Sequence, residues 1–283
     1  MGIAQYFSEW KKRRLLRKVE VAPGVWLPAA LREYWPRIAK TRMNSIRIKA
    51  IPIDDPSPMR SGFGCYPILP KGYAYPKDAN GEYLFPLAQI CCSDMPSLAG
   101  YPSTGYLQFY IGCEDFGVDF KNPVSQLNFR VLYFEDEEVS VRETDFSFLE
   151  AVMASDESPV SKPHSLAFSL RDDYLGVGEV REQEYPEILA ELEKRYPDLA
   201  EELDNEICKE FACIDHKIGG YAYFTQTDPR EGEELYKNWL LLFQMDSDDK
   251  IMWGDVGVAN FFIAPEDLAR RDFTKVFYTW DCC

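Results

Sequence analysis

Histidine is the scarcest reactive side chain in this sequence of 283 residues, which has only His164 and His216. Neither has a partner histidine at a metal-ligand spacing, so a zinc hydrolase is not expected. Gly-x-Ser-x-Gly elbows and Cys-x-x-Cys pairs are missing as well, and no Ser or Cys nucleophile with its base can be nominated. We therefore expect a protein without a catalytic set, a cofactor or a resident metal.

Long apolar runs are also missing from the sequence. No stretch of about 18 apolar residues could span a membrane, and no apolar segment follows the N-terminal charges as it would in a secretory signal. The hydrophobic content of 46% is enough for a large core without disulfides. We expect a cytoplasmic protein whose eight cysteines are mostly reduced thiols.

Charge is plentiful, but it is distributed unevenly. The net charge is −16; residues 1–60 carry 13 Lys and Arg against 5 Asp and Glu, whereas residues 61–283 carry 18 against 42. The first segment is therefore at +8 and the second at −24. Such a field repels nucleic acid and anionic membranes and attracts a basic partner. A cationic protein is the natural candidate.

An internal repeat is the most informative pattern in the sequence. Ser61-Gly-Phe-Gly-Cys-Tyr aligns with His216-Lys-Ile-Gly-Gly-Tyr, and Gln89 and Gln244 follow at the same offset of 155. A third pair, Gly105-Tyr-Leu-Gln-Phe-Tyr-Ile and Gly257-Val-Ala-Asn-Phe-Phe-Ile, follows in the same order. This order predicts two superposable strand arrangements, in which both glutamines are buried and bonded to backbone.

The patterns predict an α+β fold with an internally duplicated, mainly antiparallel sheet core, an acidic helical insert and an N-terminal helical arm. The basic arm and a first strand are expected in residues 1–60. The duplicated core covers residues 61–283. It divides into repeat one at about 61–135, the helical insert at about 145–212 and repeat two at about 213–283.

Helical spacing is clearest in the arm and in the insert. Residues 6–18 place Phe7, Trp10 and Leu15 on one stripe, which we expect to pack onto the body rather than onto RNA or a membrane. Residues 185–195 and 197–211 predict two acidic amphipathic helices, each with a proline in its first turn.

An acidic stretch follows the second glutamine. Asp246-Ser-Asp-Asp249 and Asp255 offer oxygen ligands for calcium or magnesium, but the glycine and the final glutamate of an EF-hand loop are absent. An acidic turn that closes a strand is the plainer interpretation, and a metal site is the alternative.

Several motifs together resemble those of the YwqG-like proteins, a bacterial family without a known function. They include Pro86-Leu-Ala-Gln-Ile, Leu241-Leu-Phe-Gln-Met-Asp and Met252-Trp-Gly-Asp, and the resemblance covers nearly everything after residue 40. It implies an α+β core, the bacterial cytoplasm and no assigned catalytic residues. Some members of that family are candidate immunity proteins of polymorphic toxins. The structural signature consists of Gly64, Gln89, Gly219, Gly220, Gln244, Trp253, Gly254 and Asp255.

The charge and the resemblance together predict an immunity protein that binds one basic toxin domain and masks its active site. The contact is expected through acidic segments, with the loop at 154–163 inserted into the toxin and the helices near 184–210 beside it. The partner-binding candidates are Glu135, Asp136, Glu137, Glu138, Asp156 and Glu157. The alternative is an uncharacterised enzyme or a small-ligand binder that uses a cleft between the repeats.

Overall fold

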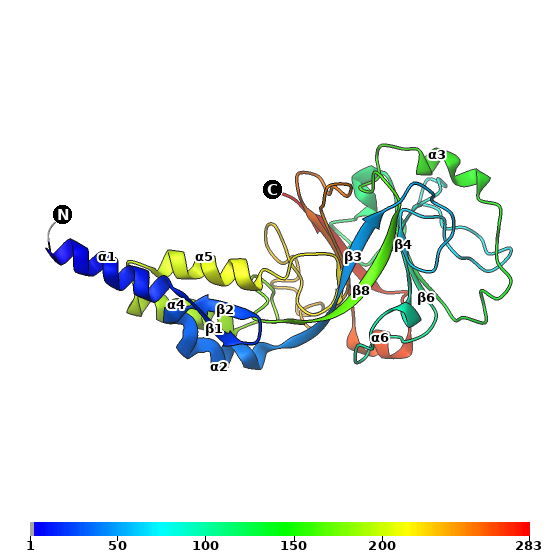
Figure 1. Ribbon diagram of the computed structural model, residues 1–283. Coiled ribbons are helices and arrows are strands. Elements are labelled where there is room, and N and C mark those ends of the chain that lie inside the picture. The colour runs from blue at the N-terminus through cyan, green and yellow to red at the C-terminus, as the bar shows by residue number, and fades with distance from the viewer. Residues whose placement is uncertain (1–2) are drawn as a thin grey trace.

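The computed structural model describes residues 3–283, with side chains from residue 9 onward. Figure 1 shows an elongated molecule with a helical lobe at one end and a strand-rich body at the other. Two long strands, β3 (Met43–Pro52) and β8 (His164–Asp173), run from the body toward the lobe. No helix in residues 3–283 combines the length and the apolar character needed to cross a bilayer.

The body is built on one antiparallel sheet, which confirms the expected α+β class. Within residues 3–283 its strands lie in the order β12-β11-β10-β9-β3-β8-β4-β5-β6-β7. The remaining strands of this sheet are β4 (Gly62–Phe63), β5 (Phe85–Cys91), β6 (Tyr106–Ile111), β7 (Phe129–Phe134), β9 (Lys217–Gly219), β10 (Leu240–Asp246), β11 (Val258–Ile263) and β12 (Val276–Asp281).

The internal repeat of the sequence reappears as a repeat of topology. Strands β4 to β7 form a meander on one side of the central β3–β8 pair, and β9 to β12 form the same meander on the other side. Even an irregularity is repeated, because the register shifts between Pro86 and Ala88 in β5 and between Leu241 and Phe243 in β10. These two positions are related by the same offset of 155 that relates the glutamines.

The two glutamines make equivalent hydrogen bonds. Gln89 accepts from the Ile68 N–H at 2.7 Å, and Gln244 accepts from the Tyr223 N–H at 2.8 Å. The side-chain amide of Gln89 donates to the Met59 carbonyl, just before β4. The side-chain amide of Gln244 donates to the Asp215 carbonyl, just before β9. Both glutamines are buried. Each therefore satisfies backbone groups of the irregular segments on both sides of β4 or β9, which have no strand partners there.

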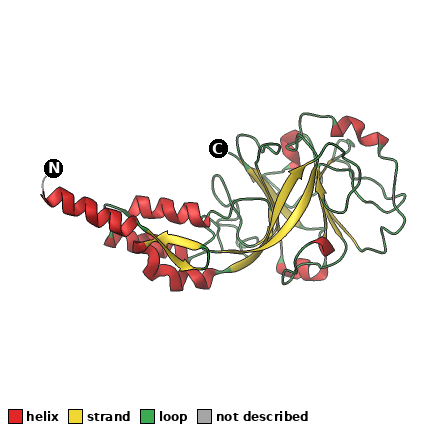
Figure 2. Cartoon of the chain, viewed as in Figure 1, coloured by secondary structure: helices red, strands yellow, loops and turns green. Residues whose placement is uncertain are grey.

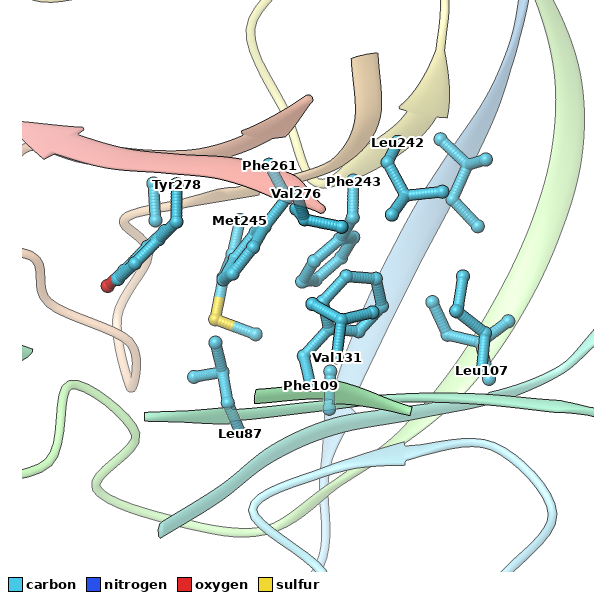
Figure 3. Packing of buried hydrophobic residues seen from close by; sticks show 14 of the residues in the cluster. Leu87, Leu107, Phe109, Val131, Leu242, Phe243, Met245, Phe261, Val276 and Tyr278 are labelled. Atoms are coloured by element: carbon cyan, nitrogen blue, oxygen red, sulfur yellow. The ribbon is translucent and has the colours of Figure 1, made fainter. Parts of the chain in front are cut away.

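The two meanders face each other across the main hydrophobic core. Figure 3 shows Leu87, Phe109 and Val131 pointing toward side chains of the other meander. The ring centroids of Phe109 and Phe261 lie 4.9 Å apart. The sheet is thus curved so strongly that the inner faces of its two halves pack against each other. This packing buries apolar side chains from both repeats in one core.

The edge strands β7 and β12 do not pair directly; the segment between β6 and β7 bridges them. Tyr278 of β12 donates its N–H to the Pro123 carbonyl at 2.9 Å. The Gln126 side chain accepts from the Val131 N–H at 2.8 Å and donates to the Phe273 carbonyl at 2.7 Å. The sheet is therefore nearly closed, and loop groups replace the missing strand ladder.

The helical lobe is formed by the segment that precedes β3 and the segment that follows β8. Its N-terminal part consists of α1 (Ile3–Leu16), β1 (Lys18–Ala22), β2 (Val25–Pro28), η1 (Ala29–Tyr34), α2 (Trp35–Ile38) and η2 (Ala39–Thr41). Its second part consists of α4 (Glu184–Arg195) and α5 (Ala200–Phe211), shown with the other helices in Figure 2. Leu31 and Ile38 share a separate apolar core with Ile188 and Leu203. The body carries five shorter helices within residues 3–283: η3 (Cys92–Asp94), η4 (Glu114–Gly117), η5 (Ser147–Leu149), α3 (Glu150–Met153) and α6 (Pro265–Arg270).

Opposite charges meet within this lobe. Residues 1–42 carry ten Lys and Arg against three Glu, whereas residues 174–212 carry four against twelve Asp and Glu. Arg37 contacts Glu184, Glu187 and Glu191 of α4, and Lys12 of α1 pairs with Glu202 of α5. The basic arm therefore neutralises the acidic insert of its own chain.

The sequence-based boundaries differ from the structure in several places. Residues 43–52 form a central strand of the sheet rather than part of a separate arm, and the region assigned to the helical insert contains the strand β8. Trp10 is 53% exposed, so its expected packing is wrong; its ring instead lies under Arg14. The side chain of Phe7 lies outside the described residues. The second acidic helix begins at Ala200, because the residues after Pro197 form a turn.

The glutamine hydrogen bonds predict a large and specific stability loss. Gln244→Leu keeps the size of the side chain but leaves the Tyr223 N–H and the Asp215 carbonyl unpaired, so we expect the free energy of unfolding to fall by about 3 kcal/mol. Urea denaturation measures this change. Gln183→Leu, at an exposed position, is the matched control and should change it by less than about 0.5 kcal/mol. Equal effects of the two variants would contradict the structural role of Gln244.

The ion pairs of the lobe predict a salt-dependent effect. Arg37→Gln removes contacts with three glutamates at a partly exposed site, so we expect a loss of about 1 kcal/mol at low ionic strength. The loss should shrink in high salt because screening weakens the same pairs. Arg32→Gln, an exposed arginine of the same segment, provides the control in the same denaturation series. A loss that is independent of salt would show that packing, not charge, holds Arg37.

Candidate functional site

The first acidic segment lies at one end of the β6–β7 hairpin. Glu135 follows β7 directly and pairs with Arg271, which lies near the other edge of the sheet. Asp136, Glu137 and Glu138 occupy the exposed turn that follows. Glu135 is therefore partly neutralised within the chain, and the three carboxylates after it face solvent.

The second acidic segment lies in a loop that is fastened to repeat two. Ser161 donates its N–H to the Lys250 carbonyl at 2.9 Å, and Met252 donates to the Pro159 carbonyl at 2.8 Å. Pro159 is buried, whereas Asp156 and Glu157 are exposed. The second half of the loop at 154–163 is therefore held by strand-like hydrogen bonds, and its first half carries the two exposed carboxylates.

The structure keeps these two acidic segments apart. Glu157 lines a pocket with Gly112, which follows the end of β6. Phe134, next to Glu135, pairs with Tyr106 at the opposite end of the same hairpin. The length of β7 separates the two ends by roughly 17 Å, at about 3.4 Å per residue. A single small ligand cannot contact both segments.

The pocket beside Glu157 has a volume of about 660 Å³. It lies between the turn before β5, the segment after β6, the helix α3 and the loop that follows α3. Its lining residues are Asp78, Asn80, Glu82, Tyr83, Gly112, Cys113, Glu114, Phe148, Ala151, Val152, Ser155 and Glu157. Four of these carry carboxylates, and none is a lysine or an arginine.

This acidic pocket has the chemistry of a site for an organic cation. Its carboxylates supply negative charge, and the rings of Tyr83 and Phe148 lie 4.8 Å apart in its wall. Aromatic faces attract cations, and Tyr83 already does so, because Lys77 Nζ lies 4.2 Å from its ring centroid. Burial raises the pKa of the Cys113 thiol, and the carboxylate of Glu157 adds to this effect. The thiol therefore stays protonated and unreactive.

Two aspartates of residues 246–255 hold backbone groups of the fold. Asp246 accepts the Asp215 N–H at 2.9 Å, and Asp248 accepts the N–H groups of Lys250 and Ile251. Asp255 is exposed. Within residues 3–283, no group of three or more His, Cys, Asp or Glu side chains is arranged to hold a metal ion. The interpretation as an acidic turn fits these contacts.

His216 is occupied by structural hydrogen bonds. Its Nδ1 accepts the Asp246 N–H at 3.0 Å, just as Ser61 Oγ accepts the Cys91 N–H in repeat one. Its Nε2 lies 3.3 Å from Asp248, and this hydrogen bond lowers the pKa of the Asp248 carboxyl to about 2. With both ring nitrogens engaged, His216 is not free to act as a general base.

The signature residues of the repeats are structural as well. Gly64 and Gly219 adopt φ values of 59° and 69°, which favour glycine, and a side chain on Gly220 would meet Asp173 Oδ2 at 2.1 Å. Trp253 is fully buried in the main core. Gly254 also has a positive φ, of 55°. These residues shape the turns of the repeats and do not line the acidic pocket.

The sequence did not predict a buried ionic network of Arg230, Asp228 and Glu179. Arg230 is fully buried and contacts Asp228 at 2.6 Å and Glu179 at 3.2 Å. Burial by itself would raise the pKa of the Glu179 carboxyl, but Arg181 and Arg230 lower it below its ordinary value. Glu179 also accepts the Ala222 N–H at 3.1 Å. The network fastens the segment before α4 to repeat two, and the motif Asp228-Pro-Arg230 was its only signal in the sequence.

The other histidine predicts a pH dependence of stability. His164 is fully buried with no hydrogen-bond partner on either ring nitrogen among the described residues, and burial lowers its pKa below 6.5. The unfolded chain binds a proton below pH 6.5 while the folded chain does not, so stability must fall from pH 7 toward the lowered pKa. His164→Leu should reduce this loss. Urea denaturation at pH 8, 6 and 5 tests it, and an unchanged pH dependence would contradict the assignment.

Comparison with known proteins places most of the chain in one family. A family model described as "Domain of unknown function (DUF1963)" matches residues 61–282. A search of curated proteins gave no match. The matched segment begins just before β4 and ends just after β12, so it includes both meanders, β8 and the acidic helices. Because the match covers well over half of the sequence, the chain belongs to the DUF1963 family.

Proposed function

We propose that this chain is a cytoplasmic immunity protein, which binds one basic toxin domain per chain and covers the active site of that domain. The observation that carries the proposal is the location of unbalanced negative charge. Residues 43–173 and 213–283, which form the body, carry 17 Lys and Arg against 32 Asp and Glu. The lobe is close to neutral, so the excess of fifteen negative charges belongs to the body.

This distribution moves the proposed contact away from the acidic helices. Glutamates of α4 and α5 are already paired with the basic arm, and a partner would have to displace those pairs. Carboxylates of the body, such as Asp156 and Glu157, are exposed instead. Their field accelerates the approach of a cationic protein, while buried contacts determine how long the complex lasts.

The acidic pocket supplies a place for such a buried contact. Its volume of about 660 Å³ accommodates a lysine or arginine side chain with room for a neighbouring residue. Carboxylates at its rim can pair with a guanidinium, and the rings of Tyr83 and Phe148 can stack on its plane. An arginine of the toxin, held in this way, is the anchor we propose for the interface.

The resemblance to YwqG-like proteins supports the same proposal. The match to a family of unknown function neither names a toxin nor assigns a reaction. The motifs around Gln89 and Gln244, however, are those on which the resemblance rests, and some members of the YwqG-like family are candidate immunity proteins. A binding role also agrees with the engaged nitrogens of His216 and the raised pKa of Cys113.

The same pocket favours one alternative, a small-ligand-binding protein. Its volume lies within the range of small-molecule sites, about 300–1,000 Å³. Spermidine and arginine amide are suitable probes, since both are cations of the right size. If they bind to the pocket and Glu82→Gln with Glu157→Gln abolishes the binding heat, while no toxin binds, the small-ligand function takes precedence.

Charge reversal tests the proposed interface. Asp156→Lys with Glu157→Lys should slow association with a candidate basic toxin domain by roughly tenfold at low salt, because the reversal weakens the steering field. The difference should diminish as salt is added. Biolayer interferometry at several ionic strengths measures the rate, and growth of cells that express the toxin measures protection.

The matched control applies the same change of charge to the lobe. Glu193→Lys with Asp198→Lys alters two exposed carboxylates of the acidic helical region, and it should slow association much less. Undetectable association with every candidate toxin domain, or equal slowing by both pairs of reversals, would contradict the proposed interface on the body.

A further inference from the structure

Strand β8 has one edge without a partner. It pairs with β3 along its full length, from His164 to Asp173. On its other side, β4 pairs only with His164 and Ser165. Within the chain from residue 3 to 283, no backbone hydrogen bond to a residue outside β3 involves residues 166–172. Figure 2 shows this part of the long strand between the body and the lobe.

Backbone groups along such an edge need another partner. About half of the N–H and C=O groups of a strand point to each side, so several groups of residues 166–172 lack a protein partner. Native proteins protect open edges with charged residues, proline or bulges. Arg171 and Asp172 supply charge at one end of this edge, but Leu166-Ala-Phe-Ser-Leu170 contains none of these features, and Leu170 is 55% exposed. This edge is therefore suited to pairing with a further strand.

The side chains along this edge are arranged symmetrically about Phe168. Leu166 and Leu170 lie two residues to either side on one face, and the small residues Ala167 and Ser169 lie on the other. An antiparallel copy centred on Phe168 would place Leu166 opposite Leu170 twice and Phe168 opposite itself. A two-fold axis requires this kind of self-complementary pattern.

We propose that β8 pairs with β8 of a second copy of this chain, forming a two-fold symmetric dimer centred on Phe168. The apolar faces of Leu166, Phe168 and Leu170 then join in one stripe across both sheets. The polar residues on either side of this stripe are compatible with the register, because Arg171 would face Ser165 of the second copy rather than another positive charge. Within its own chain, Arg171 pairs with Asp215 at 2.9 Å, and Asp172 accepts from Asn44 at 2.7 Å.

The dimer goes beyond the proposed function and does not depend on it. The acidic pocket is lined partly by α3, at the far end of the body, whereas β8 runs from the body toward the lobe (Figure 1). Each copy would keep its own pocket, so one toxin domain per chain remains possible in the dimer. Loss of the dimer and loss of toxin binding are consequently separate results.

Sedimentation velocity across low to high micromolar concentration tests the dimer with the full chain. Leu170→Lys places a charge in the shared apolar stripe at a position exposed in the single chain, so it should raise the dissociation constant by at least about tenfold. Leu235→Lys makes the same substitution at another exposed leucine and should leave the constant unchanged. A wild-type chain that is monomeric throughout, or a dimer that both variants retain, overturns the proposal.

Cysteine crosslinking tests the register. In the proposed pairing Ala167 faces Ser169 of the second copy, at a Cα separation of about 4.5–5.5 Å that a disulfide can span. The double variant Ala167→Cys with Ser169→Cys should therefore give a covalent dimer under mild oxidation, and adding Leu170→Lys should prevent it. Wild type treated in the same way controls for the native cysteines. A crosslink that survives Leu170→Lys, or a monomer that instead uses this edge to bind a different protein, contradicts the homodimer.

Discussion

The rest of the structure depends on the antiparallel pairing of β3 with β8. This ten-residue ladder is the centre of the sheet, and each of the two repeated meanders begins beside one of its strands. Because the strands are antiparallel, the chain enters β3 and leaves β8 at the same end of the ladder. The basic arm before β3 and the acidic helices after β8 must therefore meet, and they form the lobe.

The contact between the basic arm and the acidic helices determines where the net negative charge of the chain is exposed. The arm and the insert look, in the sequence, like a cationic tail and an anionic surface, but they neutralise each other through pairs such as Arg37 with Glu184. The uncompensated charge lies on the body, and Glu82, Glu114 and Glu157 of the acidic pocket are part of it. A partner attracted by the field of the protein is thus directed toward the body. This distribution, rather than the total of −16, supports the proposed interface.

The duplicated sheet was predictable, because Gln89 and Gln244 recur at one offset and each determines the same backbone hydrogen bonds. The strand β8 was missed although Leu166, Phe168 and Leu170 alternate in the sequence. The acidic pocket could not be predicted, since Glu82, Glu114 and Glu157 come from three separate segments that only the tertiary fold brings together. The neutralisation of the acidic helices by the basic arm of the same chain could not be predicted either, because pairing between distant segments leaves no local pattern in the sequence.

Hydrogen exchange of the chain with and without the proposed toxin partner tests the central claim most directly, because it maps the contact without substitutions. The account predicts slower exchange on binding around the pocket, in residues 78–83, 112–114 and 148–157, and unchanged exchange in α4 and α5. Slower exchange confined to α4 and α5, with the pocket segments unchanged, would contradict the claim that the acidic body is the binding surface.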